Sequence, residues 1–215
     1  MEYNDYAIGH AHINYLDRYF KYSIFLWQNF EKIDDIRKKV LNSHMRKKFC
    51  AAVISNSFIS DNFRLDFLEE LNKYKKIDMG GRYKNNIGKA VDNKIEFLSS
   101  YKFSIAMENT NGDGYITEKI IHSFISGTIP IYYGDYMVDE YINPKSYILI
   151  KGIKDMKEKI DYIKLIDNND KIYKNILKEK VIIDYNFVNS IDNELKLFLT
   201  NIFMQDKKKA FRINN

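Results

Sequence analysis

The side chains best suited to chemistry lie in one polar segment, which connects a strand-like run to a helix-like run: Glu108, Asn109, Tyr115, Glu118 and Lys119. The strand-like run ends at Met107, and the helical pattern begins at Thr117 after a loop that contains two glycines. Ligands of open α/β sheets bind beyond the carboxyl ends of the strands, where this loop is expected. A helix start adds unpaired N–H groups and a partial positive charge, which favour a phosphate.

Lys119 is unusual at its position, because the helix dipole disfavours a cation in the first turn of a helix. A lysine at this position therefore suggests that an anion lies beside it and offsets the unfavourable charge. The alternative is that Glu118 and Lys119 form an ordinary solvated pair on the surface. Residues 109–117 also resemble the start of a calcium-binding EF-hand loop, but the twelfth position, which needs a glutamate, is Ile120. We therefore expect no metal at this loop.

The segments around this loop alternate between strand-like and helix-like patterns. Short apolar runs bounded by polar residues predict buried parallel strands, and apolar residues three and four apart predict helices. The predicted strands cover residues 49–55, 76–79, 101–107, 128–133 and 147–150, and helices are predicted at residues 63–71, 93–99 and 117–126. Gly127 is the expected C-cap of the last of these helices. This order predicts an α/β protein with a Rossmann-like parallel sheet.

The chain divides into three predicted parts. Residues 1–46 open with a run at residues 5–9 that looks like a buried strand, and they include a helix-like run at residues 31–39. Residues 47–150 form the Rossmann-like unit. Residues 151–215 read as amphipathic helices that end in a basic tail of three lysines, residues 207–209.

Composition narrows the class of protein. The 215 residues carry a formal net charge of +5, which is too small and too evenly spread to predict nucleic-acid binding. A single cysteine, Cys50, excludes a disulfide framework and a cysteine-based zinc site. No apolar run approaches the ~20 residues that span a bilayer, and the N-terminus lacks a signal peptide pattern. A cytoplasmic protein is expected, with at most peripheral contact of its basic tail with the inner face of a membrane.

Two histidines raise the question of a metal site. His10 and His12 are spaced to share one face of a strand, which would suit a pair of metal ligands. No third ligand is apparent near them in the sequence, so exposed histidines are the preferred interpretation.

Residues 103–135 resemble the signature of the α-1,3/α-1,4-fucosyltransferases, glycosyltransferase family 10. In that signature an aromatic strand leads into Glu-Asn, then Tyr-x-Thr-Glu-Lys, a turn of small residues, Ile-Pro-Ile-Tyr and Gly. Here these parts are Glu108-Asn109, Tyr115-Ile116-Thr117-Glu118-Lys119, Gly127-Thr128, Ile129-Pro130-Ile131-Tyr132 and Gly134. The turn Asn143-Pro144-Lys145-Ser146 and the stretches at residues 5–9, 49–56 and 80–88 are similar to bacterial members.

The resemblance implies the C-terminal, GDP-fucose-binding half of a two-domain GT-B fold. Such enzymes transfer L-fucose to a glycan hydroxyl with inversion, and the expected linkage is α-1,3 to N-acetylglucosamine. The resemblance matches Arg64 and Lys119 to cations that hold the pyrophosphate, and Glu118 to a carboxylate near the ribose or fucose. Asn109 and Tyr115 match polar groups of the donor pocket. Arg82, after two glycines, and Glu108 are further donor-site candidates.

The resemblance also implies that neither a metal nor a cofactor is needed. The family's catalytic glutamate lies in a Gly-Glu-Asn segment just before the stretch matched by residues 5–9. It is therefore expected upstream of Met1, and no catalytic residue of this sequence is assigned. The chain is expected to be a truncated enzyme of doubtful activity, with a separate N-terminal half as a further partner. The alternative is a non-catalytic module that binds a GDP-sugar; a basic nucleic-acid binder ranks below both.

Overall fold

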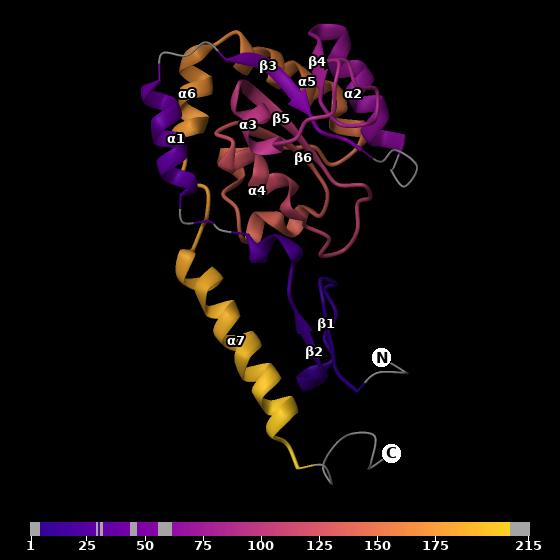
Figure 1. The fold of residues 1–215 in the computed structure, drawn as a ribbon, viewed down its shortest axis with the longest axis vertical. Helices are drawn as coiled ribbons and strands as arrows, with labels where there is room; N and C mark the ends of the chain where they lie inside the picture. Colours follow the sequence, from indigo (N-terminus) through magenta and orange to yellow (C-terminus); the bar gives the residue numbers. More distant parts are fainter. Residues whose placement is uncertain (1–4, 29, 31, 44–46, 56–61, 207–215) are drawn as a thin grey trace.

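A five-stranded parallel sheet forms the centre of the protein (Figure 1). In the computed structural model, which describes residues 5–28, 30, 32–43, 47–55 and 62–206, the strands lie in the order β4-β3-β5-β6-β7. They are β3 (Lys48–Ala52), β4 (Ile77–Met79), β5 (Tyr101–Met107), β6 (Ile129–Tyr133) and β7 (Ile148–Leu149). All neighbouring pairs are parallel, so the predicted Rossmann-like sheet is confirmed.

The strand order places a switch point beside β3. This strand pairs with β4 on one side and with β5 on the other, so the chain builds one edge of the sheet before it crosses to the opposite side. Loops that leave the carboxyl ends of β3 and β5 therefore diverge there and open a crevice in which open α/β sheets bind ligands. The loop after β5 is the segment with the candidate residues.

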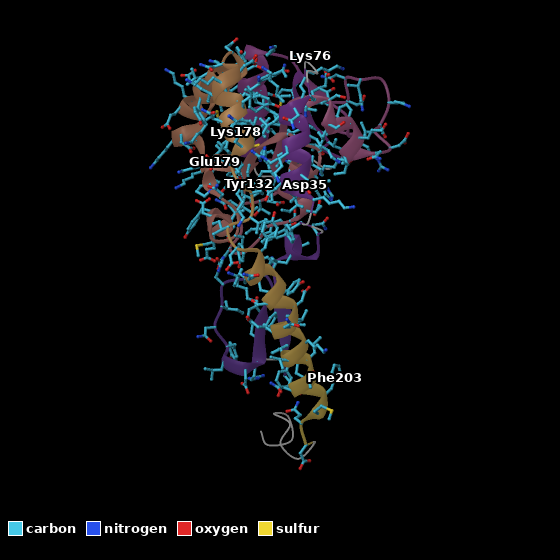
Figure 2. All side chains as sticks on the ribbon, turned by 90° about the vertical axis from the view of Figure 1, so that its left-hand side faces the viewer. Asp35, Lys76, Tyr132, Lys178, Glu179 and Phe203 are labelled. Atoms are coloured by element: carbon cyan, nitrogen blue, oxygen red, sulfur yellow. The ribbon has the colours of Figure 1, made fainter. Side chains whose placement is uncertain are left out.

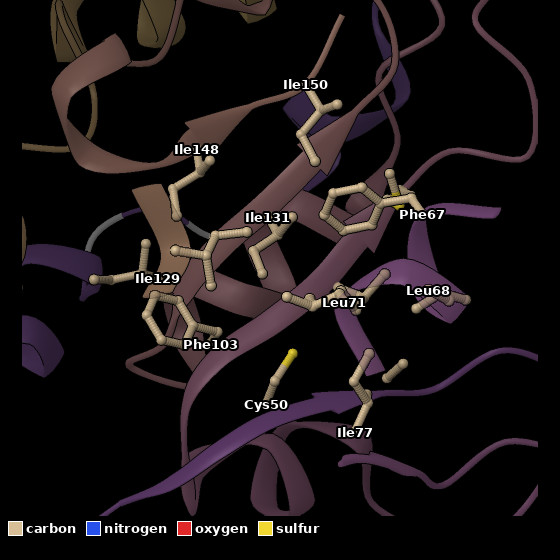
Figure 3. Close-up of a cluster of buried hydrophobic side chains, with 14 of the residues drawn as sticks. Cys50, Phe67, Leu68, Leu71, Ile77, Phe103, Ile129, Ile131, Ile148 and Ile150 are labelled. Carbon is tan, nitrogen blue, oxygen red and sulfur yellow. The ribbon is translucent and has the colours of Figure 1, made fainter. Parts of the chain in front are cut away.

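Helices cover both faces of this sheet (Figure 1), and the side chains of the central strands are divided between a core cluster on each face, one of which Figure 3 shows. The helices of this unit are α2 (Asn62–Tyr74), α3 (Lys94–Ser99), α4 (Glu118–Ile125), α5 (Ile153–Asp167) and α6 (Asp170–Lys178). Phe103 and Ile131 belong to the core cluster that α2 helps to close, whereas Ala106 and Tyr132 belong to the cluster around α4. Burial on both faces explains why the strands read as continuous apolar runs.

Helix α1 (Ile33–Asn42) packs against α6 and α4, although it lies before the predicted Rossmann-like unit in the sequence. Its Arg37 side chain is buried and donates to three backbone carbonyls, those of Leu177 at 3.1 Å, Ser146 at 3.2 Å and Ile176. A buried guanidinium needs such acceptors, because an unpaired charge would be costly in the interior. These bonds fix α1 to the segments that follow the sheet.

The last helix, α7 (Tyr185–Met204), extends away from the sheet beside a small parallel pair, β1 (Ala7–Gly9) and β2 (Tyr19–Lys21) (Figure 1). Phe203, near the far end of α7, is largely exposed (Figure 2). The predicted strand at residues 5–9 is thus present but not buried, and Ile8 is 49% exposed. Two short strands form a sheet too small to be covered by other elements on both faces, so its residues are only partly buried.

Two further expectations concern the C-terminal part. The helical character predicted after residue 151 is confirmed by α5, α6 and α7, whereas the lysines at residues 207–209 lie outside the described residues. None of the helices that the structure describes is long and apolar enough to cross a membrane.

Gly127 ends α4 in the left-handed region, with φ +68°, as predicted for a C-cap. A Cβ atom there would lie 2.6 Å from Val40 Cγ2 of α1, whereas a Cβ at Gly88, with φ +90°, would meet nothing within 4 Å. We expect Gly88→Ala to destabilise the protein by about 1 kcal/mol through backbone strain alone, and Gly127→Ala to cost about 1 kcal/mol more because α1 must shift. Urea unfolding of both variants measures the difference, and equal losses would contradict the close packing of α1.

Candidate functional site

Glu108 joins the end of β5 to the start of α4. Its carboxylate is fully buried, and its Oε1 accepts hydrogen bonds from the Thr117 backbone N–H at 2.8 Å and the Thr117 hydroxyl at 2.7 Å. Thr117 is the N-cap of α4, so the same residue also begins the helix. The two ends of the loop are therefore held together by one carboxylate, which fixes where α4 starts relative to the sheet.

Lys119 completes this arrangement from the first turn of α4. Its Nζ lies 2.5 Å from Glu108 Oε2 and 3.1 Å from the Thr117 hydroxyl oxygen. The anion that a lysine at a helix start requires is thus supplied within the protein, and the unusual position of Lys119 does not by itself demand a ligand. An ammonium group has three donors. Two are used here, so one is left without a partner among the described residues.

The pKa of Glu108 depends on its own burial and on its partner Lys119. Burial raises the pKa of Glu108, and the Lys119 ammonium and the Thr117 donors act in the opposite direction. A buried carboxylate is costly unless it is paired and hydrogen-bonded. Lys119 therefore stabilises the negative charge of Glu108, and it would also stabilise an anion that binds at the edge of the sheet.

Arg64 brings a second cation to the same place. It lies in the first turns of α2, is 2% exposed, and donates from Nη1 to Asn109 Oδ1 at 2.8 Å. Burial lowers the pKa of Arg64 and the nearby Glu108 raises it, but a guanidinium stays protonated at neutral pH. Residues from α2, the end of β5 and the start of α4 thus meet at the switch point of the sheet.

Glu118 and Lys94 bring two further opposite charges, which influence each other, close to Lys119. Although burial alone would raise it, the pKa of Glu118 lies below its ordinary value because of its own backbone N–H and the nearby Lys119 and Lys94. Lys94 is the first residue of α3, and burial lowers its pKa while Glu118 raises it. Lys94 is a functional candidate that was not predicted, although, like Lys119, it is a lysine in the first turn of a helix.

The N-terminal segment packs on the outer part of the loop. The ring of Tyr115 meets the ring of His10 edge to face, with centroids 5.3 Å apart. Gly114, with φ +72°, is approached so closely that a Cβ would lie 1.7 Å from the His10 carbonyl oxygen. No side chain fits there, so this glycine is required for the contact between the two segments.

The structure corrects the expectation for His12. Its Nε2 lies 2.9 Å from Asp135 Oδ2 and 3.5 Å from Asp113 Oδ1, and its Nδ1 lies 2.8 Å from Lys21 Nζ. His12 is therefore half-buried in a charged cluster and is not a free surface histidine. One ligand atom from each of His12, Asp113 and Asp135 lies within 4.8 Å of the others, a grouping that the sequence spacing did not reveal. Asp135 also accepts from the Gly114 N–H at 2.6 Å, which gives it a structural role.

The candidates are not all brought together. Arg64, Glu108, Asn109 and Lys119 form one connected group, Glu118 adjoins it, and Tyr115 lies at the contact with the N-terminal segment. Arg82, after β4, is exposed and forms no hydrogen bond or ion pair with the other candidates in the described part of the chain. The arrangement offers two cations and several polar groups to an anion at the carboxyl edge of the sheet.

The catalytic base is not expected among the donor-site residues. It was expected upstream of Met1, and Met1 itself lies outside the residues that the structure describes, which begin at Asp5. The position of the base therefore stays a prediction. The contacts of Arg64 and Lys119 suit the binding of an anion, and no described residue is assigned to proton transfer.

Comparison with known proteins gives consistent results. Residues 43–196 match the family model of the C-terminal part of glycosyltransferase family 10 (fucosyltransferase). The chain is 34% identical over 206 residues to the alpha-(1,3)-fucosyltransferase FucT of Helicobacter pylori, covering 81% of this chain and 43% of that protein. It is 31% identical over 181 residues to the putative fucosyltransferase R654 of Acanthamoeba polyphaga mimivirus, covering 78% of this chain and 30% of that protein.

Solved structures extend this likeness to the fold. A crystal structure of an alpha1,3-fucosyltransferase with GDP-fucose matches with a TM-score of 0.75 and 30% identity, over 92% of this chain and 70% of that one. Another, with GDP, matches with a TM-score of 0.78 and 29% identity, over 94% of this chain and 70% of that one. The predicted α/β fold, shared with GT-B fucosyltransferases, is confirmed. The chain spans less than half the length of the curated relatives named above.

Proposed function

The chain belongs to glycosyltransferase family 10, the fucosyltransferases, and from this premise we propose that it binds GDP-fucose at the carboxyl edge of its sheet. The observation that carries the proposal is the convergence of Arg64 and Lys119 on the loop after β5. Both cations lie at the switch point, and Lys119 has one ammonium proton without a partner in the described part of the chain. A pyrophosphate placed there meets two cations that the fold already holds in position.

The neighbouring groups have complementary roles in this proposal. Glu118, whose pKa is lowered, is an ionised acceptor for the hydroxyls of the ribose or the fucose. Asn109 uses its carbonyl oxygen for Arg64, which leaves its amide N–H groups for the donor. The Tyr115 hydroxyl, which has no hydrogen-bond partner among the described residues, is a further donor-site group. Both carboxylate oxygens of Glu108 are taken by Thr117 and Lys119, and a carboxylate has no donor for a phosphate, so in this proposal Glu108 positions Lys119.

The proposed reaction is transfer of L-fucose to a glycan hydroxyl, in α-1,3 linkage to N-acetylglucosamine. The acceptor oxygen attacks the anomeric carbon as the bond from that carbon to the GDP oxygen breaks, with inversion of configuration. Negative charge develops on the departing diphosphate, and Lys119 and Arg64 stabilise it. A base must take the hydroxyl proton on the opposite face, and no residue of this chain is assigned to that step.

Binding and turnover measured on one sample test this proposal. Titration with GDP-fucose, release of free fucose, and transfer to N-acetyllactosamine acceptors separate a transferase from a protein that only binds the donor. Saturable binding with transfer supports the full proposal. Binding without transfer reduces it to donor binding, and absence of binding would overturn it.

We also propose that donor binding needs no divalent metal, because Arg64 and Lys119 supply the positive charge that a metal otherwise provides. The dissociation constant for GDP is expected to be the same, within about twofold, in chelator and in millimolar magnesium or manganese. Isothermal titration calorimetry measures this comparison. A strict requirement for either metal would contradict the proposed role of the two cations.

A further inference from the structure

A histidine and two carboxylates from different parts of the chain converge on the outer end of the candidate donor loop. They are His12 of the N-terminal segment, Asp113 of the loop, and Asp135, which follows β6. One ligand atom from each of the three lies within 4.8 Å of the others. Imidazole nitrogen and carboxylate oxygen are both ligands of zinc in proteins, and two ionised carboxylates balance the charge of the ion.

The separations of these atoms fit a tetrahedral ion. Two ligand atoms that each lie about 2.0–2.1 Å from a tetrahedral zinc ion are about 3.3 Å apart. His12 Nε2 lies 2.9 Å from Asp135 Oδ2 and 3.5 Å from Asp113 Oδ1, so the two values lie on either side of that separation. The contacts of the histidine therefore need to change by only a few tenths of an ångström to admit the ion.

Asp135 is already held in the orientation of a ligand. Its side chain is 3% exposed, and the backbone N–H groups of Gly114 and Met137 donate to its two oxygens at 2.6 Å and 3.0 Å. Outer hydrogen bonds of this kind orient ligating carboxylates in metal sites. The side chain of Asp113 is 65% exposed, so the cluster is open to solvent on that side. An ion can enter there, and water can take the fourth position.

Lys21 supplies a positive charge to the cluster from the other side of the imidazole ring. Its Nζ lies 2.8 Å from His12 Nδ1, and an ammonium group only donates. Nδ1 therefore accepts, and Nε2 carries the proton that faces Asp135. A zinc ion on Nε2 moves this proton to Nδ1, where it faces the ammonium. Lys21 can then turn to Glu140, whose Oε2 lies 3.9 Å from its Nζ.

We propose that His12, Asp113 and Asp135 bind a zinc ion, which ties the N-terminal segment to the loop between β5 and α4. The ion has a structural role, since neither Arg64 nor Lys119 is among its ligands. The proposal does not depend on GDP-fucose binding, and it leaves the charge of the pyrophosphate to those two cations. Lys21 opposes the ion, because its ammonium must leave the imidazole ring before zinc binds.

Titration of the full chain with zinc chloride tests the proposal by calorimetry, after treatment with chelator and its removal. The parent is expected to bind zinc saturably, with one ion per chain. Asp113→Asn removes an exposed ligand, so this variant should fold normally. It should bind zinc at least about tenfold more weakly, because even the loss of an outer partner of a metal ligand has an effect of that size. His10→Asn is the matched control, since His10 precedes His12 by two residues and lies outside the cluster.

Lys21→Gln distinguishes a metal site from a charged network that only holds the segment in place. Glutamine removes the ammonium and offers the Nδ1–H of His12 a carbonyl acceptor, which is the usual outer partner of a ligating histidine. Zinc should therefore bind this variant about tenfold more tightly than the parent, although a contact of the metal-free network is lost. The proposal is overturned if the parent does not bind zinc, if Asp113→Asn binds it as tightly, if His10→Asn weakens binding as much as Asp113→Asn does, or if Lys21→Gln does not tighten it.

Discussion

A Lys119→Met variant is expected to bind GDP about 10- to 150-fold more weakly than the parent chain. Methionine keeps the length and apolar stem of the side chain and removes the ammonium, so the change isolates the charge. Charge-assisted hydrogen bonds contribute about 1.5–3 kcal/mol, which corresponds to this range of affinity. Calorimetry with GDP in chelator measures it directly.

The same substitution also changes stability, and the two effects must be separated. Without Lys119, the buried Glu108 carboxylate keeps its hydrogen bonds from Thr117 but loses its ion pair, and burial then favours its protonation. We expect Lys119→Met to unfold at lower urea concentration than the parent. The double variant Lys119→Met/Glu108→Gln removes the unpaired charge and should recover part of that stability, but none of the GDP affinity.

The double variant therefore decides what Lys119 does. If GDP affinity returns together with stability, Lys119 acts only on the fold and its proposed contact with the pyrophosphate is wrong. Arg64→Met should weaken GDP binding in the same direction, because its guanidinium lies on the other side of the same loop. A variant of either cation that binds GDP as well as the parent does would remove that residue from the proposed site.

The sheet and the position of the site were predictable because the signals are local. Each strand is a short apolar run buried on both faces, and β5 was predicted with the bounds that the structure shows, 101–107. The N-cap at Thr117 and the C-cap at Gly127 are short-range chemistry as well. The ligand-binding edge then follows from the strand order, because the loops diverge at the switch point.

The internal partner of Lys119 was not predictable in this way. Glu108 and Lys119 are separated by a loop whose path depends on the whole sheet, and nothing in their spacing shows that the carboxylate faces inward. A sequence pattern identifies a charged residue in a loop as a ligand-binding candidate. It does not distinguish a group that meets the ligand from one that holds its neighbour in place.

Contacts of the N-terminal segment were missed for the same reason. His12 and Asp135 are more than one hundred residues apart in the chain, and the spacing of His10 and His12 gives no sign of a buried acceptor. The close approach of His10 to Gly114 depends on a glycine that looks like an ordinary loop residue. Long-range contacts of this kind become visible only when the loop and the segment are placed together.

The second large effect is expected for Asp135→Asn, which should destabilise the protein by about 2–4 kcal/mol at pH 7. Asp135 is 3% exposed and accepts from three donors, the Gly114 N–H at 2.6 Å, the Met137 N–H at 3.0 Å and His12 at 2.9 Å. An asparagine of the same shape has one acceptor oxygen, and its NH₂ group would face a donor. At least one of the three donors would lose its acceptor.

The lowered pKa of Asp135 sets the direction in which its contribution to stability changes with pH. Burial alone would raise the pKa of Asp135, but the bonds from Met137, His12 and Gly114 together hold it below its ordinary value. The folded state therefore binds the proton less readily than the unfolded state. The stabilisation is complete above the unfolded pKa of ~3.9 and is lost as the pH falls through the lower, folded value.

Urea unfolding of the parent and of Asp135→Asn should therefore show a constant difference from pH 7 to about pH 5 and a shrinking one below about pH 4. Asp113→Asn is the matched control, because Asp113 belongs to the same cluster but is 65% exposed in its side chain and meets His12 only at 3.5 Å. That variant should stay within about 0.5 kcal/mol of the parent.

Equal losses of stability for the two variants, or a difference that does not shrink in acid, would mean that Asp135 does not hold the Gly114 loop in the way its contacts indicate. If the losses differ as expected, two buried carboxylates hold the loop that carries the candidate donor site: Glu108 joins its two ends, and Asp135 holds it at Gly114.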